Sequence, residues 1–178
     1  AEELPEGGLL YENRLLLILG AEIELGGRQQ GSAHFLAFFP SLVQMQRFSS
    51  LLSGYVTNPN LSCQRAKGTP EEWFDRVESL GGLFIPAHVF TPFKSLFGNM
   101  AESLAEVFRP DQIERLTAAE LGLSADTDLA DMISDLASVT FLSNSDAHSL
   151  PKIAREYNAF AMESLCYREW EMALRNQK

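Results

Sequence analysis

The chain has 178 residues, 46% of them hydrophobic and 21% charged, which is typical of one globular domain with a sizeable core, residues 1–178. No apolar run reaches the roughly 18 residues that a membrane-spanning helix needs, so we expect no membrane partner. The net charge of −10 argues against binding nucleic acid through a general basic surface. Carboxylates that ligate metal ions count as formal negatives, however, so nucleic acid stays open as a partner.

The cysteines and the N-terminal segment bear on the cellular compartment. Only two cysteines occur, Cys63 and Cys166, and they do not form a C-x-x-C pair. We therefore expect neither a disulfide framework nor a structural zinc finger. The first residues, AEELPEGG, lack the basic and then apolar layout of a signal peptide. These features favour a reducing, cytoplasmic environment.

Apolar runs alternate with helical patterns along the chain. Runs bounded by Gly, Pro or polar residues predict strands at 15–25, 34–39, 82–87, 118–123 and 138–142. Helical spacing predicts helices at 41–52, 69–80, 100–108 and 128–136, and the second of these opens with the N-terminal signal T-P-E-E. This alternation, without a hairpin signal, predicts an α/β fold with a mainly parallel sheet. An open doubly wound sheet and a (β/α) barrel both fit the pattern.

Each of the three histidines lies next to a predicted strand. His34 stands within AHFLAFF, and His88 closes the run LFIPAH. His148 follows the strand VTFL in the segment SNSDAHS, two residues after Asp146. Because the carboxyl ends of parallel strands converge, we expect these side chains to meet at one edge of the sheet.

The strand LLLILGAEIEL adds two carboxylates, Glu22 and Glu24. Residues i and i+2 of an extended strand point to the same face, so Glu22 and Glu24 share a face. Asp146 and His148 share one too if the extended geometry persists there. A Glu, two single His residues and a D-x-H pair form a mixed nitrogen and oxygen set that suits Zn, Mn or Fe.

Simpler roles compete with a metal site at each position. A single His beside a strand is more often a hydrogen-bonded polar residue than a ligand, and Glu22 or Glu24 alone could be a solvated carboxylate. Asp146 and His148 could cap a following helix. Other chemistries have less support. The chain has no phosphate-binding P-loop and no G-x-G-x-x-G, and Gly122-Leu-Ser-Ala-Asp126 lacks the second glycine of a nucleophile elbow.

The candidate ligands stand in motifs that resemble a known family. GAEI at 20–23, AHFLAFF, PAH at 86–88 and SDAH at 145–148 resemble the later metal motifs of the PHP (polymerase and histidinol phosphatase) family, in that family's order. Within it, PAHVFTPFKSLFG, ELGLSADTDLADMISDL and SNSDAHSLPKIAREYN resemble the endonuclease Q group. The resemblance covers residues 15–160.

The resemblance implies a distorted (β/α)7 barrel and a metal-dependent phosphodiesterase that cleaves DNA beside deaminated bases such as hypoxanthine and uracil. It implies two or three divalent ions, Zn, Mn, Mg or Fe, in the complete domain. The implied metal ligands are Glu22, His34, His88, Asp146 and His148, with Glu22, Asp146 and His148 closest to catalysis. Glu24 is implied as a neighbour that supports a ligand.

The chain departs from the family pattern in two ways. It contains no H-x-H motif, which opens the family domain, and it stops before the Cys-rich zinc-binding region of the endonuclease Q group. We therefore expect a fragment with an incomplete barrel, and with metal binding and activity that are weakened or lost. An incomplete barrel exposes a strand edge, so we also expect self-association.

Substrate contact is expected in the loop 90–99, where Phe93 and Phe97 flank Lys94. Aromatic side chains with an interleaved Lys can hold a base and its phosphate, although the two phenylalanines could instead pack the loop onto the fold. Arg155 and Lys152 follow the D-A-H motif. They could reach a phosphate, or they could be ordinary solvent-exposed surface residues. Two alternatives to a DNA endonuclease remain, a PHP phosphatase for a small phosphomonoester and a non-catalytic binding module.

Overall fold

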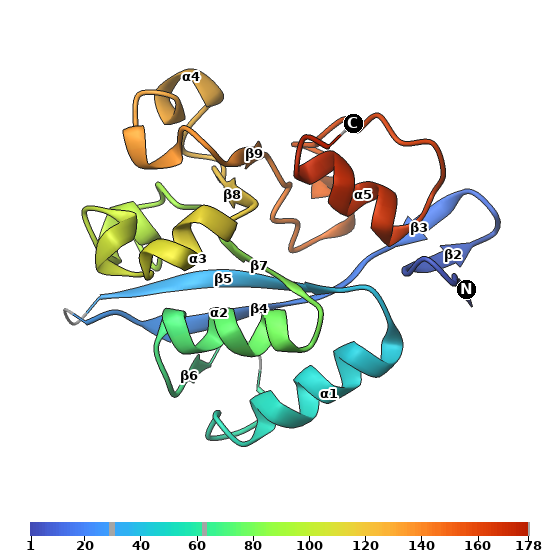
Figure 1. Ribbon diagram of the computed structural model, residues 1–178, viewed down its shortest axis with the longest axis horizontal. Helices are drawn as coiled ribbons and strands as arrows, with labels where there is room; N and C mark the ends of the chain where they lie inside the picture. Colours follow the sequence, from blue (N-terminus) through green and yellow to red (C-terminus); the bar gives the residue numbers. More distant parts are fainter. Residues whose placement is uncertain (29–30, 62–63, 178) are drawn as a thin grey trace.

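The central sheet of the protein is built around an antiparallel hairpin. A computed structural model describes residues 1–28, 31–61 and 64–177 (Figure 1). Strands β4 (Leu19–Gly26) and β5 (Ser32–Phe39) pair antiparallel along their whole length. Strand β7 (Leu83–Pro86) joins β5 antiparallel, and the short β6 (Arg65–Ala66) joins β4 parallel, which gives the order β6-β4-β5-β7.

The predicted mainly parallel arrangement is wrong for this sheet. A glycine-rich segment, GGRQQG at 26–31, connects β4 to β5, and the Gly27 amide donates to the Gly31 carbonyl at 2.8 Å across the turn. A loop of three to five residues that contains glycine is a common connection between antiparallel strands. It is a hairpin signal, and the alternation of strands and helices concealed it.

The described part of the chain also contains two smaller sheets. Strands β1 (Glu2–Glu3), β2 (Leu9–Tyr11) and β3 (Leu15–Leu17) form an antiparallel sheet near the N-terminus. Strands β8 (Ala118–Glu120) and β9 (Thr140–Leu142) pair parallel, as the sequence predicted for these runs. The fold is therefore mixed α/β, and across residues 1–28, 31–61 and 64–177 these sheets do not close into a barrel.

Within the described residues, five α-helices accompany the strands. They are α1 (Leu42–Ser53), α2 (Pro70–Ser79), α3 (Pro110–Arg115), α4 (Thr127–Ala130) and α5 (Tyr167–Leu174). The predicted start of α2 is confirmed. Thr69 is its N-cap, Pro70 is the first helical residue, and Thr69 forms a capping box with Glu72. No helix in the described ranges is both long and apolar enough to cross a membrane.

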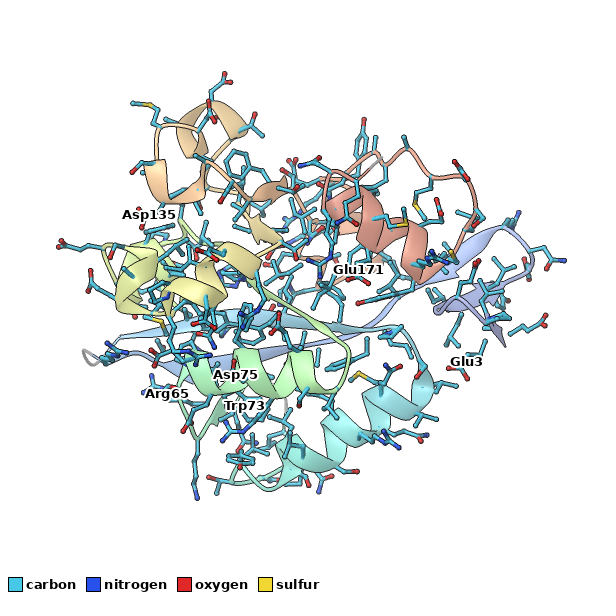
Figure 2. All side chains as sticks on the ribbon, viewed as in Figure 1. Glu3, Arg65, Trp73, Asp75, Asp135 and Glu171 are labelled. Atoms are coloured by element: carbon cyan, nitrogen blue, oxygen red, sulfur yellow. The ribbon has the colours of Figure 1, made fainter. Side chains whose placement is uncertain are left out.

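The two later helix predictions are wrong in form. Residues 100–108 fold as the end of a π-helical turn, Leu96–Met100, and a 3₁₀ turn, Leu104–Glu106. Residues 128–136 divide between α4 and the 3₁₀ turn Ser134–Leu136. Asp135, labelled in Figure 2, accepts a hydrogen bond from the Leu104 amide at 2.7 Å. This contact ties the two short turns to each other, and neither continues as a longer helix.

The two faces of the central sheet carry different layers. One set of alternating residues, including Ile23, Phe35 and Phe84, packs toward α1 and α2, where the Trp73 indole is fully buried (Figure 2). The opposite set, including Leu36 and Leu83, packs with α5 and the β8–β9 pair on the other side of the sheet (Figure 1). Period-two alternation thus places Glu22, Glu24 and His34 on the β8–β9 side.

The two cysteines are only partly described. Cys166 is buried and forms no disulfide. Cys63 lies outside the described residues. The expectation that the two cysteines form no disulfide framework therefore stays a prediction.

Candidate metal centre

Three of the predicted ligands lie together on one face of the central sheet. Single donor atoms of Glu22, His34 and His88 all lie within 4.8 Å of one another. Glu22 stands on β4, His34 on the neighbouring β5, and His88 two residues after β7. They meet because β4, β5 and β7 are adjacent strands, with β5 in the middle.

The antiparallel register explains the pairing of the two glutamates with His34. Glu24 is directly opposite His34, and Glu22 is opposite Leu36, one diagonal step away on the same face. As a result the two carboxylates flank the imidazole. Glu22 Oε1 lies 2.6 Å from His34 Nδ1, and Glu24 Oε2 lies 3.8 Å from His34 Nε2. The predicted common face of Glu22 and Glu24 is confirmed.

The donor atoms fit a divalent metal ion. His34 Nδ1 lies 3.2 Å from His88 Nε2. Zinc binds imidazole nitrogen at about 2.0–2.1 Å, which sets tetrahedral ligands about 3.3 Å apart. These two nitrogens already have nearly that separation. Glu22 Oε1 and His34 Nδ1, which lie 2.6 Å apart, would have to move apart by about 0.7 Å to bind the same ion. Two nitrogens and one carboxylate oxygen are a donor set that Zn, Mn and Fe accept.

Burial around the trio supports a site that is open on one side. The His34 side chain is 12% exposed, and Glu22 is 34% exposed. His34 Nε2 is buried and has no hydrogen-bond partner among the described residues. This nitrogen faces Glu24, whereas Nδ1 of the same ring faces Glu22 and His88.

Neighbouring side chains fix the orientation of His88. The Thr91 hydroxyl lies 3.0 Å from His88 Nδ1 and also 3.0 Å from the carbonyls of His88 and Phe93. Its one proton goes to a carbonyl, so the hydroxyl oxygen accepts from Nδ1–H of His88. The lone pair of His88 Nε2 then faces the trio, as a metal ligand requires.

The electrostatics of the two glutamates favour their charged forms. The hydrogen bond from His34 lowers the pKa of Glu22 and outweighs the effect of burial, and electrostatic interactions with His34, His88 and His148 act in the same direction. Burial raises the pKa of Glu24, but hydrogen bonds from Lys94, Ser32 and Arg65 bring it below its usual value. Both side chains are therefore carboxylates at neutral pH.

The structure places Asp146 and His148 outside the trio. Asp146 has φ +43°, so the extended geometry does not persist after β9, and the two side chains do not alternate as in a strand. His148 is 83% exposed, and its Nδ1 lies 3.0 Å from the Asp146 carbonyl oxygen. His148 still lies close enough to lower the pKa of Glu22.

The two phenylalanines of the loop after His88 have different environments. Phe93 is 79% exposed. Phe97 is partly buried and stacks on Phe90, with ring centroids 5.6 Å apart. Between them, the Lys94 ammonium lies 2.8 Å from Glu24 Oε2. The loop thus exposes the ring of Phe93 and packs the ring of Phe97 against the fold. Its Lys94 forms an ion pair with the buried carboxylate of Glu24.

Arg155 contacts the segment that carries the D-A-H motif. Its guanidinium donates to the carbonyl of Ser145 at 2.7 Å and to that of Asp146 at 3.3 Å. Lys152 stands in the short 3₁₀ turn Leu150–Lys152 and is exposed. Arg155 therefore holds the backbone beside Asp146 in this structure.

Two residues near the trio were not selected from the sequence. One is Thr91, which orients His88, and the other is Glu120, a buried carboxylate at the end of β8 that accepts a hydrogen bond from the His88 amide at 3.0 Å. The criterion applied to the histidines, a polar residue at the end of a strand, would have found Glu120. No sequence pattern marks a threonine that orients a histidine.

Comparisons with known proteins give two curated relatives. Over 177 residues the chain is 47% identical to the uncharacterized protein YqxK of Bacillus subtilis (strain 168), which covers 98% of this chain and 45% of that protein. It is 44% identical over 78 residues to the uncharacterized protein MJ0043 of Methanocaldococcus jannaschii, over 42% of this chain and 9% of that protein. The chain thus spans less than half the length of these relatives. No family model matches it.

Two solved structures share the fold. One is the lesion-specific endonuclease PfuEndoQ from Pyrococcus furiosus, with a TM-score of 0.85 and 32% identity. The other is Endonuclease Q in complex with a 27-mer duplex that has an abasic lesion at the active site, with a TM-score of 0.86 and 31% identity. Each likeness covers 99% of this chain and 43% of the other chain.

Proposed function

We propose that this chain is part of a metal-dependent phosphodiesterase that cleaves DNA beside a damaged base, as an endonuclease of the PHP type. The observation that carries the proposal is the convergence of Glu22, His34 and His88 on one face of the sheet. The likeness to lesion-specific endonuclease Q over nearly the whole chain supports the choice of substrate. The proposal includes a PHP-type barrel and substrates with deaminated bases.

Glu22, His34 and His88 would hold one divalent ion, and a complete site would hold two or three with the help of Asp146 and His148. When bound, such ions lower the pKa of a coordinated water and neutralise charge on the phosphoryl group. Zn, Mn, Mg and Fe are the candidates, and the two imidazole donors favour Zn, Mn or Fe.

Protein side chains supply the remaining functions. Glu24 and Thr91 lie beside the outer nitrogens of His34 and His88 and would keep the inner nitrogens turned toward the ion. Phe93 would stack on an exposed base near the lesion, because its ring is free of the fold. Arg155 would hold the backbone of Ser145 and Asp146 so that Asp146 and His148 can complete the site.

Cleavage of defined oligonucleotides tests the proposal. Duplexes that carry one hypoxanthine, one uracil, one abasic site or no lesion are incubated with the full-length protein that contains this chain and with Mn²⁺. We expect nicking next to a lesion, none in the undamaged duplex, and loss of activity in Glu22→Gln. Glu171→Gln is the matched control, because Glu171 stands on α5 and pairs with Arg175.

Two other results would refute the proposal. Release of phosphate from histidinol phosphate without DNA cleavage would show a phosphatase. Binding of the metal without either activity would show a binding module.

A further inference from the structure

The buried carboxylate of Glu120 has no role in the function proposed above. Glu120 ends β8 and is 5% exposed. Burial raises its pKa, and hydrogen bonds from the His88 amide and the Asn144 side chain oppose that effect. A carboxylate is rarely buried unless its oxygens accept hydrogen bonds, and these two donors meet that requirement. The parts of the chain that supply them indicate what Glu120 holds in place.

The first donor belongs to the backbone that carries a candidate ligand. The His88 amide donates to Glu120 Oε2 at 3.0 Å, and the Val89 amide donates to the Glu120 carbonyl at 2.8 Å. His88 has φ +30°, a value uncommon for a residue with a side chain. Such a conformation persists only when the surroundings hold it, and Glu120 supplies two of the bonds that do so.

The second donor belongs to the segment that leads to Asp146. Asn158 clamps the exit of β9: its side-chain oxygen accepts from the Ser143 amide at 2.8 Å, and its NH₂ group donates to the Ser143 carbonyl at 3.1 Å. The same NH₂ group lies 3.0 Å from Asn144 Oδ1. Because the oxygen of Asn144 accepts from Asn158, its own NH₂ group is the part that donates to Glu120.

We propose that Glu120 is a positioning residue that fixes the His88 backbone and aligns it with the segment 143–148, so that the two parts of the candidate ligand set keep one relative placement. The proposal rests on the metal centre proposed above. Through Glu120, the loop after β7 and the loop after β9 share one buried acceptor. Neither loop can then shift without breaking a hydrogen bond to this buried side chain.

An exchange of donor and acceptor tests this role. Glu120→Gln turns one of the two acceptor oxygens into a donor, which then faces the NH₂ group of Asn144. Asn144→Asp instead places a second carboxylate against Glu120. The double variant Glu120→Gln/Asn144→Asp restores one donor and one acceptor at that contact and leaves an oxygen for the His88 amide. Both replacements preserve side-chain shape, which favours folding of all three variants.

The readouts are cobalt affinity, the visible spectrum of bound Co²⁺, and the amide proton shift of His88. We expect each single variant to weaken cobalt binding by about 10-fold to 100-fold, with a changed spectrum and a shifted His88 amide. The double variant should return to within about twofold of the wild type. Thr69→Ala is the control, because it removes a helix cap away from the site and should leave cobalt binding unchanged.

The outcomes separate the two proposals. A wild-type chain that binds no cobalt refutes the metal centre and this inference with it. A wild-type chain that binds cobalt, with single variants that bind equally well, refutes the inference alone. So does a double variant that is no better than the single ones.

Discussion

The loop that follows β7 offers a matched pair of aromatic residues with opposite expected roles. Phe93 is 79% exposed, whereas Phe97 stacks on Phe90 and packs against the core. Full burial of a phenylalanine side chain stabilises by roughly 1.5–3 kcal/mol, so the buried fifth of Phe93 contributes about 0.5 kcal/mol. Phe93→Ala should therefore change the free energy of unfolding by no more than that.

Phe97→Ala should cost more, because it removes a packed ring. Truncation of a fully buried phenylalanine costs about 3–5 kcal/mol, and for the partly buried Phe97 we expect about 2 kcal/mol. Urea denaturation of the two variants measures the contrast. Equal losses of stability would refute the packing argument.

For DNA binding we expect the opposite order, with the larger loss in Phe93→Ala. Stacking of a base on an aromatic side chain is worth about 1–3 kcal/mol, which corresponds to a loss of affinity of roughly 5-fold to 150-fold in Phe93→Ala. Fluorescence anisotropy with an abasic duplex, at fixed salt, measures this loss. Phe93→Trp should retain binding. If Phe93→Ala folds and binds the duplex as tightly as the wild type, Phe93 does not contact the substrate.

Three further predictions concern stability and local order. Thr69→Ala should destabilise the protein by about 1 kcal/mol because α2 loses its N-cap, whereas Thr69→Ser should not, as thermal denaturation will show. The hydrogen bond from Arg109 lowers the pKa of Asp75 below 3.8, so this pair stabilises the fold above that pH and the effect is lost as the pH falls through the lowered pKa. Asp75→Asn should then reduce the melting temperature at pH 7, and its difference from the wild type should shrink as the pH falls below 3.8 and Asp75 is protonated. Arg155→Met should speed hydrogen exchange of amides 145–148, whereas Lys152→Met should not.

The sequence predicted most of the elements because their signals are local. The alternation in β5 and the T-P-E-E start of α2 are both present in the structure. The pairing of strands was harder to predict, since it depends on the turn between β4 and β5. The helix predicted at 100–108 failed because a contact distant in sequence, from Asp135 to the Leu104 amide, holds a shorter turn there.

The site was predicted in part and for a partly different reason. Glu22, His34 and His88 were expected to meet at the carboxyl ends of parallel strands, but they meet across antiparallel neighbours. Alternation along β4 and β5 accounts for Glu22 and His34 regardless of strand direction, whereas His88 follows the end of β7 and has a positive φ of +30°. The placement of Asp146 depends on a backbone turn at φ +43°, which composition and spacing do not indicate.

The most direct test of the metal centre is an anomalous difference map at the zinc absorption edge, from crystals of the protein grown with zinc. We expect a peak about 2.0–2.2 Å from Glu22 Oε1, His34 Nδ1 and His88 Nε2. A map in which zinc binds elsewhere, while these three side chains contact one another without an ion, would contradict the account.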